Sequence, residues 1–141
     1  MILFVDDETR RMSPYVDACR DSGLKTEFKS DVDAAWEFVS HHASEINLLV
    51  LDVMLPTGAR YDEQSQTVGG VRTGLTFYRD VREKNPELPI LILTQSNDLE
   101  IDNTADKDQN ALVHRKQNVL PSELPDIIRG MLDARRKGGR R

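Results

Sequence analysis

The sequence predicts one α/β domain in which helices cover both faces of a parallel sheet. Short apolar runs, which are typical of buried strands, alternate along the chain with longer segments whose apolar residues recur every three or four positions. Strands that alternate with helices in this way pair in parallel through right-handed crossovers. A length of 141 residues fits a single domain that buries about two thirds of the surface of its unfolded chain.

The first element is a strand over residues 2–5, which begins almost at the start of the sequence. Ser13 followed by Pro14 is typical of an N-cap with proline at the first helical position. A helix is therefore expected from this point to about Ser22. Residues 24–29 are then predicted to form a second strand.

Ser30 is predicted to cap a second helix, which runs from Asp31 to about His42. The spacing of its apolar residues gives one buried face, formed by Val32, Ala35, Trp36 and Val39. Residues 46–51 follow as a continuous apolar run bounded by polar residues. Such a run is expected for a central strand that is covered on both faces.

A third helix is expected over residues 75–84, where Asn85 and Pro86 end it. The apolar residues 89–93 then predict a fourth strand. Residues 97–110 should hold the fourth helix, but they contain few apolar side chains. We therefore expect this helix to be short, irregular or absent.

The last strand is expected over residues 112–115, and the final helix over about 122–136. Pro125 is tolerable in that helix because it lies in the first turn. The sequence thus places a folded domain at residues 1–136 and a basic C-terminal tail at residues 137–141.

These elements predict a five-stranded, doubly wound sheet of flavodoxin-like order 2-1-3-4-5, in which the first and third strands are neighbours. Asp6 and Asp7 follow the first of these strands, and Asp52 follows the third. Open α/β sheets bind ligands at these carboxyl ends. Three carboxylates at one point repel one another unless a hard cation lies among them, and oxygen ligands favour Mg²⁺. The sequence therefore predicts a Mg²⁺ site.

Two further polar residues arrive at the same edge of the predicted sheet. Thr94 follows the fourth strand and Lys116 follows the fifth. An anion bound at Asp52 would then meet Mg²⁺, a hydroxyl group and an ammonium group. This combination indicates a magnesium-dependent phosphoryl site.

In the order of these motifs, the chain resembles the receiver domain of two-component response regulators across nearly its whole length. Each motif alone is common, but five in the right order are specific. The matching residues are the acidic turn Asp6-Asp7-Glu8, the run Asp52-Val53-Met54-Leu55-Pro56, the pair Gly74-Leu75, Thr94 and Lys116.

The resemblance implies a role for each residue near the metal. Asp7 and Asp52 would bind Mg²⁺ directly, together with the backbone carbonyl of Met54. Asp6 would hold the ion mainly through water. These four residues are the predicted metal site.

The resemblance also implies that Asp52 is the phosphoacceptor, with Thr94 and Lys116 contacting the phosphoryl group. The donor would be a histidine kinase or a histidine phosphotransfer protein, and the output would be altered contact with a downstream protein that the sequence does not name. Such a domain is not an enzyme beyond its own phosphotransfer and autodephosphorylation. A homodimer is compatible with the sequence.

Two other functions are compatible with part of the pattern. Haloacid-dehalogenase-like phosphatases also use an Asp nucleophile and Mg²⁺, but they need a second Asp two positions later, where this chain has Met54. A degenerate receiver would act as an interaction module that does not depend on phosphorylation. Whether Asp52 accepts phosphate from a small-molecule donor distinguishes these alternatives.

The chain departs from the usual receiver pattern at several positions. Gln95 replaces the usual small residue after the threonine, and Val113 replaces the usual aromatic residue before the lysine. Gln117 replaces the usual proline. Residues 58–73 form a long insertion, which we expect either to sense phosphorylation or to be a passive surface loop.

Composition and charge exclude several classes of function. The net charge of -5 argues against a general nucleic-acid-binding surface, so no DNA is expected as a partner. Cys19 is the single cysteine, which excludes an internal disulfide or a thiolate metal cage. No apolar run is long enough to span a bilayer, and no signal peptide precedes the first strand, so a cytoplasmic location is expected.

Overall fold

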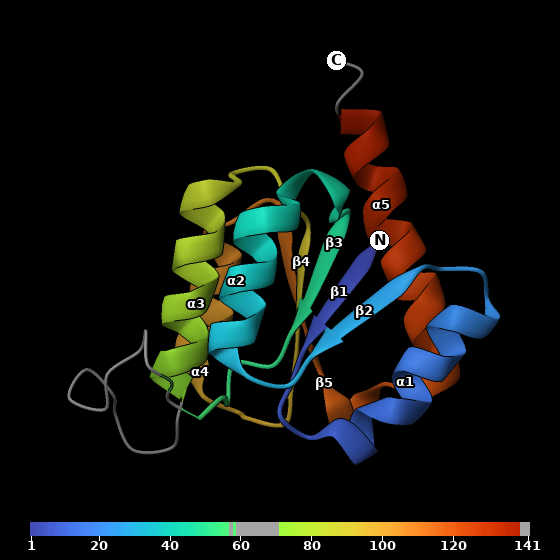
Figure 1. Cartoon of the computed structure of the whole chain (residues 1–141), viewed down its shortest axis with the longest axis horizontal. Helices are drawn as coiled ribbons and strands as arrows, with labels where there is room; N and C mark the ends of the chain where they lie inside the picture. The colour runs from blue at the N-terminus through green and yellow to red at the C-terminus, as the bar shows by residue number, and fades with distance from the viewer. Residues whose placement is uncertain (57, 59–70, 139–141) are drawn as a thin grey trace.

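A computed structural model describes residues 1–56, 58 and 71–138 of the chain, and its centre is a five-stranded sheet (Figure 1). The strands lie in the order β2-β1-β3-β4-β5, and every neighbouring pair is parallel. This confirms the predicted flavodoxin-like order. The strands are β1 (Ile2–Val5), β2 (Thr26–Lys29), β3 (Leu48–Leu51), β4 (Ile90–Thr94) and β5 (Ala111–Arg115).

Five α-helices pack around the sheet in the described part of the chain, as α1 (Thr9–Asp21), α2 (Val32–His42), α3 (Val71–Lys84), α4 (Leu99–Asp106) and α5 (Leu124–Gly138). One face of the sheet is covered by α2, α3 and α4, and the other face by α1 and α5 (Figure 1). Short 3₁₀ segments complete the fold, at Ala43–Glu45, Lys116–Asn118 and Pro121–Glu123. None of the helices in the described ranges is both long enough and apolar enough to cross a bilayer.

The central strands are buried along their whole length, because each supplies side chains to both cores. In β1, Leu3 and Val5 pack with the core beneath α2, α3 and α4, whereas Ile2 and Phe4 pack with the core beneath α1 and α5. Alternate residues of a strand point to opposite faces of a sheet. A continuous apolar run therefore encodes a strand with helices on both sides.

Helix α1 begins at Thr9, so the prediction that Ser13 caps it and Pro14 opens it is wrong. The buried residues Met12 and Val16 are one helical turn apart, and burying both requires the helix to start before Pro14. The first turn closes where the Met12 N–H donates to the Glu8 carbonyl at 3.0 Å. Core packing of Met12 thus overrides the local proline signal.

Helix α2 also starts differently from the prediction, because its N-cap is Asp31 and not Ser30. The Asp31 carboxylate accepts a hydrogen bond from the Ala34 N–H at 2.8 Å, which satisfies one of the free donors of the first turn. Helix α4 is short, as predicted, and buries only Ile101 and Ala105.

Helix α3 begins at Val71, one turn earlier than its apolar stripe predicts. Gly74 lies in its first turn against the segment that follows β3. A Cβ atom on Gly74 would lie 2.1 Å from the Cα and carbonyl oxygen of Val53, so no larger residue fits without a backbone shift.

The long insertion over residues 58–73 falls largely outside the described residues, and its expected role in sensing phosphorylation stays a prediction. At the other end of the chain, α5 continues to Gly138, slightly beyond the expected end at residue 136. Pro125 lies in the first turn of α5, as expected.

Candidate phosphoryl site

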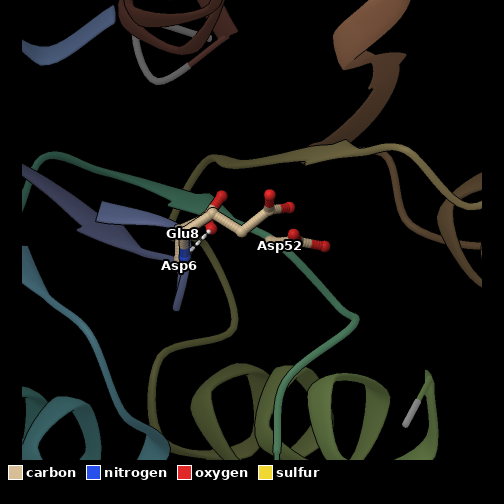
Figure 2. Close-up of side chains that lie close together, drawn as sticks. All are labelled: Asp6, Glu8 and Asp52. Carbon is tan, nitrogen blue, oxygen red and sulfur yellow. Dashed lines mark hydrogen bonds between the residues drawn. The ribbon is translucent and has the colours of Figure 1, made fainter. Parts of the chain in front are cut away.

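The ends of β1 and β3 bring two carboxylates together at the carboxyl edge of the sheet (Figure 2). Val5 and Leu51 are partners in the parallel register, and the Asp52 N–H continues the ladder by donating to the Val5 carbonyl at 2.9 Å. Asp6 and Asp52 therefore leave adjacent strands side by side. They are only 2% and 3% exposed, which is unusual for carboxylates.

Lys116 lies directly after β5 and inserts its ammonium group between these carboxylates. Its Nζ is 2.8 Å from Asp6 Oδ2 and donates a hydrogen bond of 2.9 Å to Asp52 Oδ2. A third carboxylate oxygen, Glu8 Oε1, is 3.5 Å away. The predicted meeting of Asp6, Asp52 and Lys116 at one point is thus present in the structure.

The other carboxylate oxygens of the pair are occupied by backbone donors. Asp6 Oδ1 accepts from the Glu8 N–H at 2.8 Å, and Asp52 Oδ1 accepts from the Met54 N–H at 3.0 Å. Both bonds close tight turns in which an Asp side chain binds a backbone N–H two residues ahead. These turns orient the Oδ2 atoms of both residues toward Lys116.

Burial and the closeness of two carboxylates shift the pKa values of the charged groups in this site. Burial and, next, the charge of Asp52 together raise the pKa of Asp6 to about 6, although Lys116 opposes both effects. Burial lowers the pKa of Lys116, but the charges of Asp52 and Asp6 outweigh burial and leave the pKa above its ordinary value. Lys116 is therefore an ammonium at neutral pH.

The oxygen atoms of the site fit a hard divalent cation. One carboxylate oxygen each from Asp6, Glu8 and Asp52 lies within 4.8 Å of the others (Figure 2). Asp6 Oδ2 is buried and accepts no hydrogen bond of regular geometry, so its contact with Lys116 is an ion pair. An all-oxygen set that includes a partly unsatisfied carboxylate suits Mg²⁺ better than a softer metal.

Glu8, which has no predicted role in the site, lies in this cluster beside Asp6 and Asp52. The Asp7 side chain is largely exposed and is not part of the group of three; its partial burial, with the charge of Asp52, still raises its pKa. The sequence pattern indicates Glu8 only as the third residue of an acidic turn. The signal lies in the turn itself, since the bond from the Glu8 N–H to Asp6 folds the chain back over the site.

The remaining predicted residues lie around this centre. Thr94 ends β4 with its side chain fully buried, and its hydroxyl oxygen accepts from the Ser96 N–H at 3.2 Å. Met54 carries its side chain outward, half exposed, while its N–H holds Asp52. Gln95 is exposed beside Thr94. The functional roles of these residues, and of Asp7 as a metal ligand, stay predictions.

The family comparison covers most of the chain. The model of the response regulator receiver domain family matches residues 2–113, which include Asp6, Asp52 and Thr94. Lys116 lies just beyond the matched range. No curated protein shows significant similarity to the chain.

Solved structures of receiver domains have the same fold. A CheY-like receiver domain protein of Methanospirillum hungatei has a TM-score of 0.76 at 20% identity, with 97% of this chain and 96% of that chain covered. A receiver domain protein of Clostridium thermocellum has a TM-score of 0.75 at 19% identity, with coverage of 96% and 95%. NtrX of Brucella abortus has a TM-score of 0.76 at 23% identity over 99% of this chain and 28% of that chain.

Proposed function

The chain belongs to the response regulator receiver domain family, and on that premise we propose that it accepts a phosphoryl group on Asp52 in two-component signal transduction. One observation carries this proposal most directly. The carboxylate of Asp52 ends a central strand, is buried, and is held by the Met54 N–H on one oxygen and by the Lys116 ammonium on the other. Its position is fixed before any donor arrives, which reduces the entropic cost of reaction.

Asp52 acts as the nucleophile. One of its oxygens forms a bond to phosphorus while the bond from phosphorus to the histidine nitrogen of the donor breaks, and the product is an aspartyl phosphate. The histidine nitrogen carries away the bonding electrons and takes up a proton. Lys116 then provides a fixed positive charge for the transferred oxygens, and Thr94 donates a hydrogen bond to them.

Asp7, Asp52 and the backbone carbonyl of Met54 would hold Mg²⁺ directly, and Asp6 would hold it mainly through water. When bound, the ion offsets negative charge on the phosphoryl oxygens. The protein modifies itself once and does not turn over a separate substrate. Its donor would be a histidine kinase or a histidine phosphotransfer protein in the cytoplasm, and its output would be altered contact with a downstream protein.

The rival functions lack comparable support. A phosphatase of the haloacid-dehalogenase type needs an acid two positions after its nucleophile, and Met54 has neither a titratable group nor a buried side chain. A degenerate receiver has no need to keep a buried lysine between two buried carboxylates, because burying three charges costs free energy. We therefore favour phosphorylation on Asp52.

The test is incubation of the full chain with acetyl phosphate and Mg²⁺, followed by intact mass spectrometry. The wild type should gain the mass of one phosphoryl group, and Asp52→Asn should gain none. Removing the metal with a chelator should give the same result as the substitution. An unmodified wild type, in a sample shown to bind Mg²⁺, would favour the interaction module.

A further inference from the structure

We infer that Glu8 is a positioning residue for Lys116, and that its carboxylate receives the ammonium when a metal ion occupies the site. The inference rests on the proposed function and concerns how the chain makes its Mg²⁺ site available. The carboxylate oxygens of Asp6 and Asp52 are divided between two kinds of partner.

Each of these four carboxylate oxygens contacts a donor or a cation in the structure. The two Oδ1 atoms accept backbone N–H groups, from Glu8 and from Met54. The two Oδ2 atoms contact the Lys116 ammonium, at 2.8 Å and 2.9 Å. The Oδ1 atoms are tied to backbone turns, whereas the partner of the Oδ2 atoms is a side chain that can move, so we place the competition with a metal at the Oδ2 atoms.

A metal ion and the ammonium thus compete for the same two atoms. Two cations that share buried oxygens repel each other strongly, because the surroundings screen charge poorly. Lys116 must leave at least one Oδ2 atom when a divalent ion binds. An ammonium that is buried without an anionic partner is unfavourable, so the move requires another acceptor nearby.

Glu8 is that acceptor. Among the described residues, Asp6, Asp52 and Glu8 are the three whose carboxylates form ion pairs with Lys116. The Glu8 contact is the longest, at 3.5 Å, and its side chain is about one third exposed, so it lies on the open side of the site. An ammonium that leaves an Oδ2 atom and moves toward Glu8 would keep an anionic partner throughout.

The Glu8 carboxylate is already held in place for this role. Its Oε2 atom pairs with Arg11 Nε at 3.2 Å across the first turn of α1, while Oε1 faces Lys116. Its backbone N–H is fixed by Asp6. The side chain is therefore oriented from both ends and needs little reorganisation to accept the ammonium.

The experiment is a double-mutant cycle on Mg²⁺ affinity, measured by calorimetry on the full chain. The four proteins are the wild type, Glu8→Gln, Lys116→Ala and the double variant. In the presence of Lys116, Glu8→Gln should weaken Mg²⁺ binding about tenfold, the effect of losing one charge-assisted contact. In the Lys116→Ala background the same change should have an effect of about twofold or less, since no ammonium needs a new partner.

Two controls separate this role from others. Glu37→Gln makes the same change of charge on an exposed side chain of α2 and should leave Mg²⁺ affinity unchanged. Glu8→Asp keeps the charge on a shorter arm and should restore part of the lost affinity. A purely structural role for Glu8 would not produce this pattern of coupling and rescue.

The outcomes are distinct. A tenfold loss that persists in the Lys116→Ala background would overturn the inference, because Glu8 would then be acting on the metal directly. Equal affinity of the wild type and Glu8→Gln would also overturn it, while phosphorylation of both proteins by acetyl phosphate would leave the proposed function standing. A wild type with no measurable Mg²⁺ affinity would overturn both.

Discussion

The buried carboxylate of Asp6 indicates that the site is built to bind a cation. A carboxyl group that is 2% exposed and lies next to another carboxylate is a cost to the folded protein, and Lys116 offsets only part of that cost. The pKa of Asp6 is therefore raised from an ordinary value of 3.8 to about 6. A bound cation would therefore lower the free-energy cost of keeping Asp6 ionised in the folded protein.

This cost gives a prediction for the metal-free protein. Because the pKa of Asp6 is raised in the folded state, the folded protein holds this proton more tightly than the unfolded chain. The ionised group thus lowers stability above about pH 6 and has no such effect below its ordinary pKa of 3.8. Asp6→Asn should raise the free energy of unfolding at pH 8 by about 3 kcal/mol.

Urea unfolding of the wild type and Asp6→Asn, with a chelator present, would measure this difference across the pH range. It should grow as the pH rises from about 4 to 6 and then stay constant. A difference that is the same at every pH would mean that packing, and not charge, distinguishes the two proteins.

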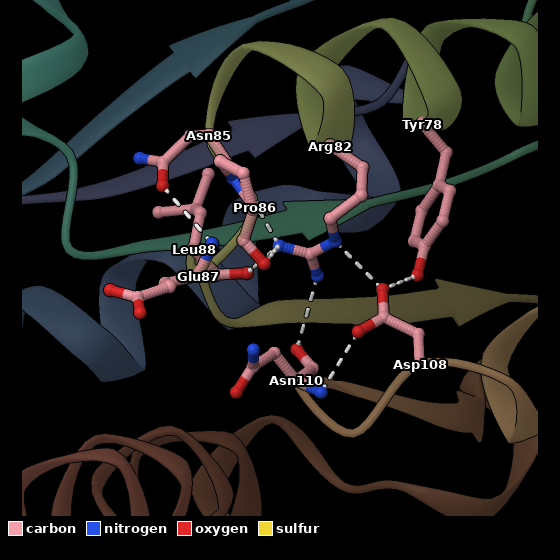
Figure 3. A network of polar contacts seen from close by, with 8 residues as sticks. All are labelled: Tyr78, Arg82, Asn85, Pro86, Glu87, Leu88, Asp108 and Asn110. Atoms are coloured by element: carbon pink, nitrogen blue, oxygen red, sulfur yellow. Dashed lines mark hydrogen bonds and ion pairs between the residues drawn. The ribbon is translucent and has the colours of Figure 1, made fainter. Parts of the chain in front are cut away.

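At the scale of elements, α3 is fixed at both ends. Its first turn lies against the backbone of Val53, directly after Asp52, because Gly74 has no side chain. Its last turn carries Arg82, whose guanidinium donates to the carbonyls of Leu88 at 2.6 Å and Asn85 at 3.1 Å (Figure 3). Helix α3 thus links the phosphoacceptor segment to the loop before β4.

Gly74→Ala should destabilise the protein by about 3 kcal/mol, since the new methyl group would lie 2.1 Å from the Val53 backbone and force a shift. Gly130→Ala is the matched control. A Cβ there meets nothing within 4 Å, and the exposed position lies inside α5, so alanine should stabilise the helix by about 1 kcal/mol. Equal effects of the two substitutions on thermal unfolding would contradict the close approach of α3.

The Arg82 network gives a second prediction at this scale. Arg82 also pairs with Asp108 at 2.8 Å, and the same carboxylate oxygen accepts from the Tyr78 hydroxyl (Figure 3). A lysine keeps the charge but cannot reach the carboxylate and the carbonyls together. Arg82→Lys should therefore cost about 2 kcal/mol of stability.

Arg79→Lys serves as its control, because Arg79 is largely exposed and lies 3.8 Å from Glu100. Exposed pairs of this kind contribute little, so this variant should unfold like the wild type. The idea that Arg82 acts as a planar clamp would be abandoned if both variants lost the same stability in denaturant.

At the scale of the whole molecule, the alternation of strands and helices, together with the rules for parallel α/β sheets, was enough to predict the sheet order and the position of Asp52. The central strands are continuous apolar runs, and such runs leave little freedom for any arrangement other than a parallel sheet covered on both faces. Residues that follow neighbouring parallel strands then lie together at the carboxyl edge of the sheet. This is why Asp6, Asp52 and Lys116 could be placed together from the sequence.

Apart from the N-cap of α2, which is a local choice between Ser30 and Asp31, the differences arise from contacts that periodicity does not encode. The start of α1 is set by burial of Met12, and the start of α3 by the approach of Gly74 to Val53, neither of which is a local signal. The position of Glu8 depends on a side-chain turn around Asp6 that no periodicity reveals. Local propensity therefore predicted which elements form, while long-range packing decided where they begin.

The central claim is that Asp52 is the single phosphoacceptor of this chain. Reduction of the acetyl phosphate-treated protein with borohydride converts an aspartyl phosphate to homoserine, and tandem mass spectrometry of its peptides locates that residue. We predict homoserine at position 52 and at no other aspartate, with none when Mg²⁺ is removed. Homoserine at Asp6 or Asp7, or unmodified aspartate at position 52 in the phosphorylated protein, would contradict the account.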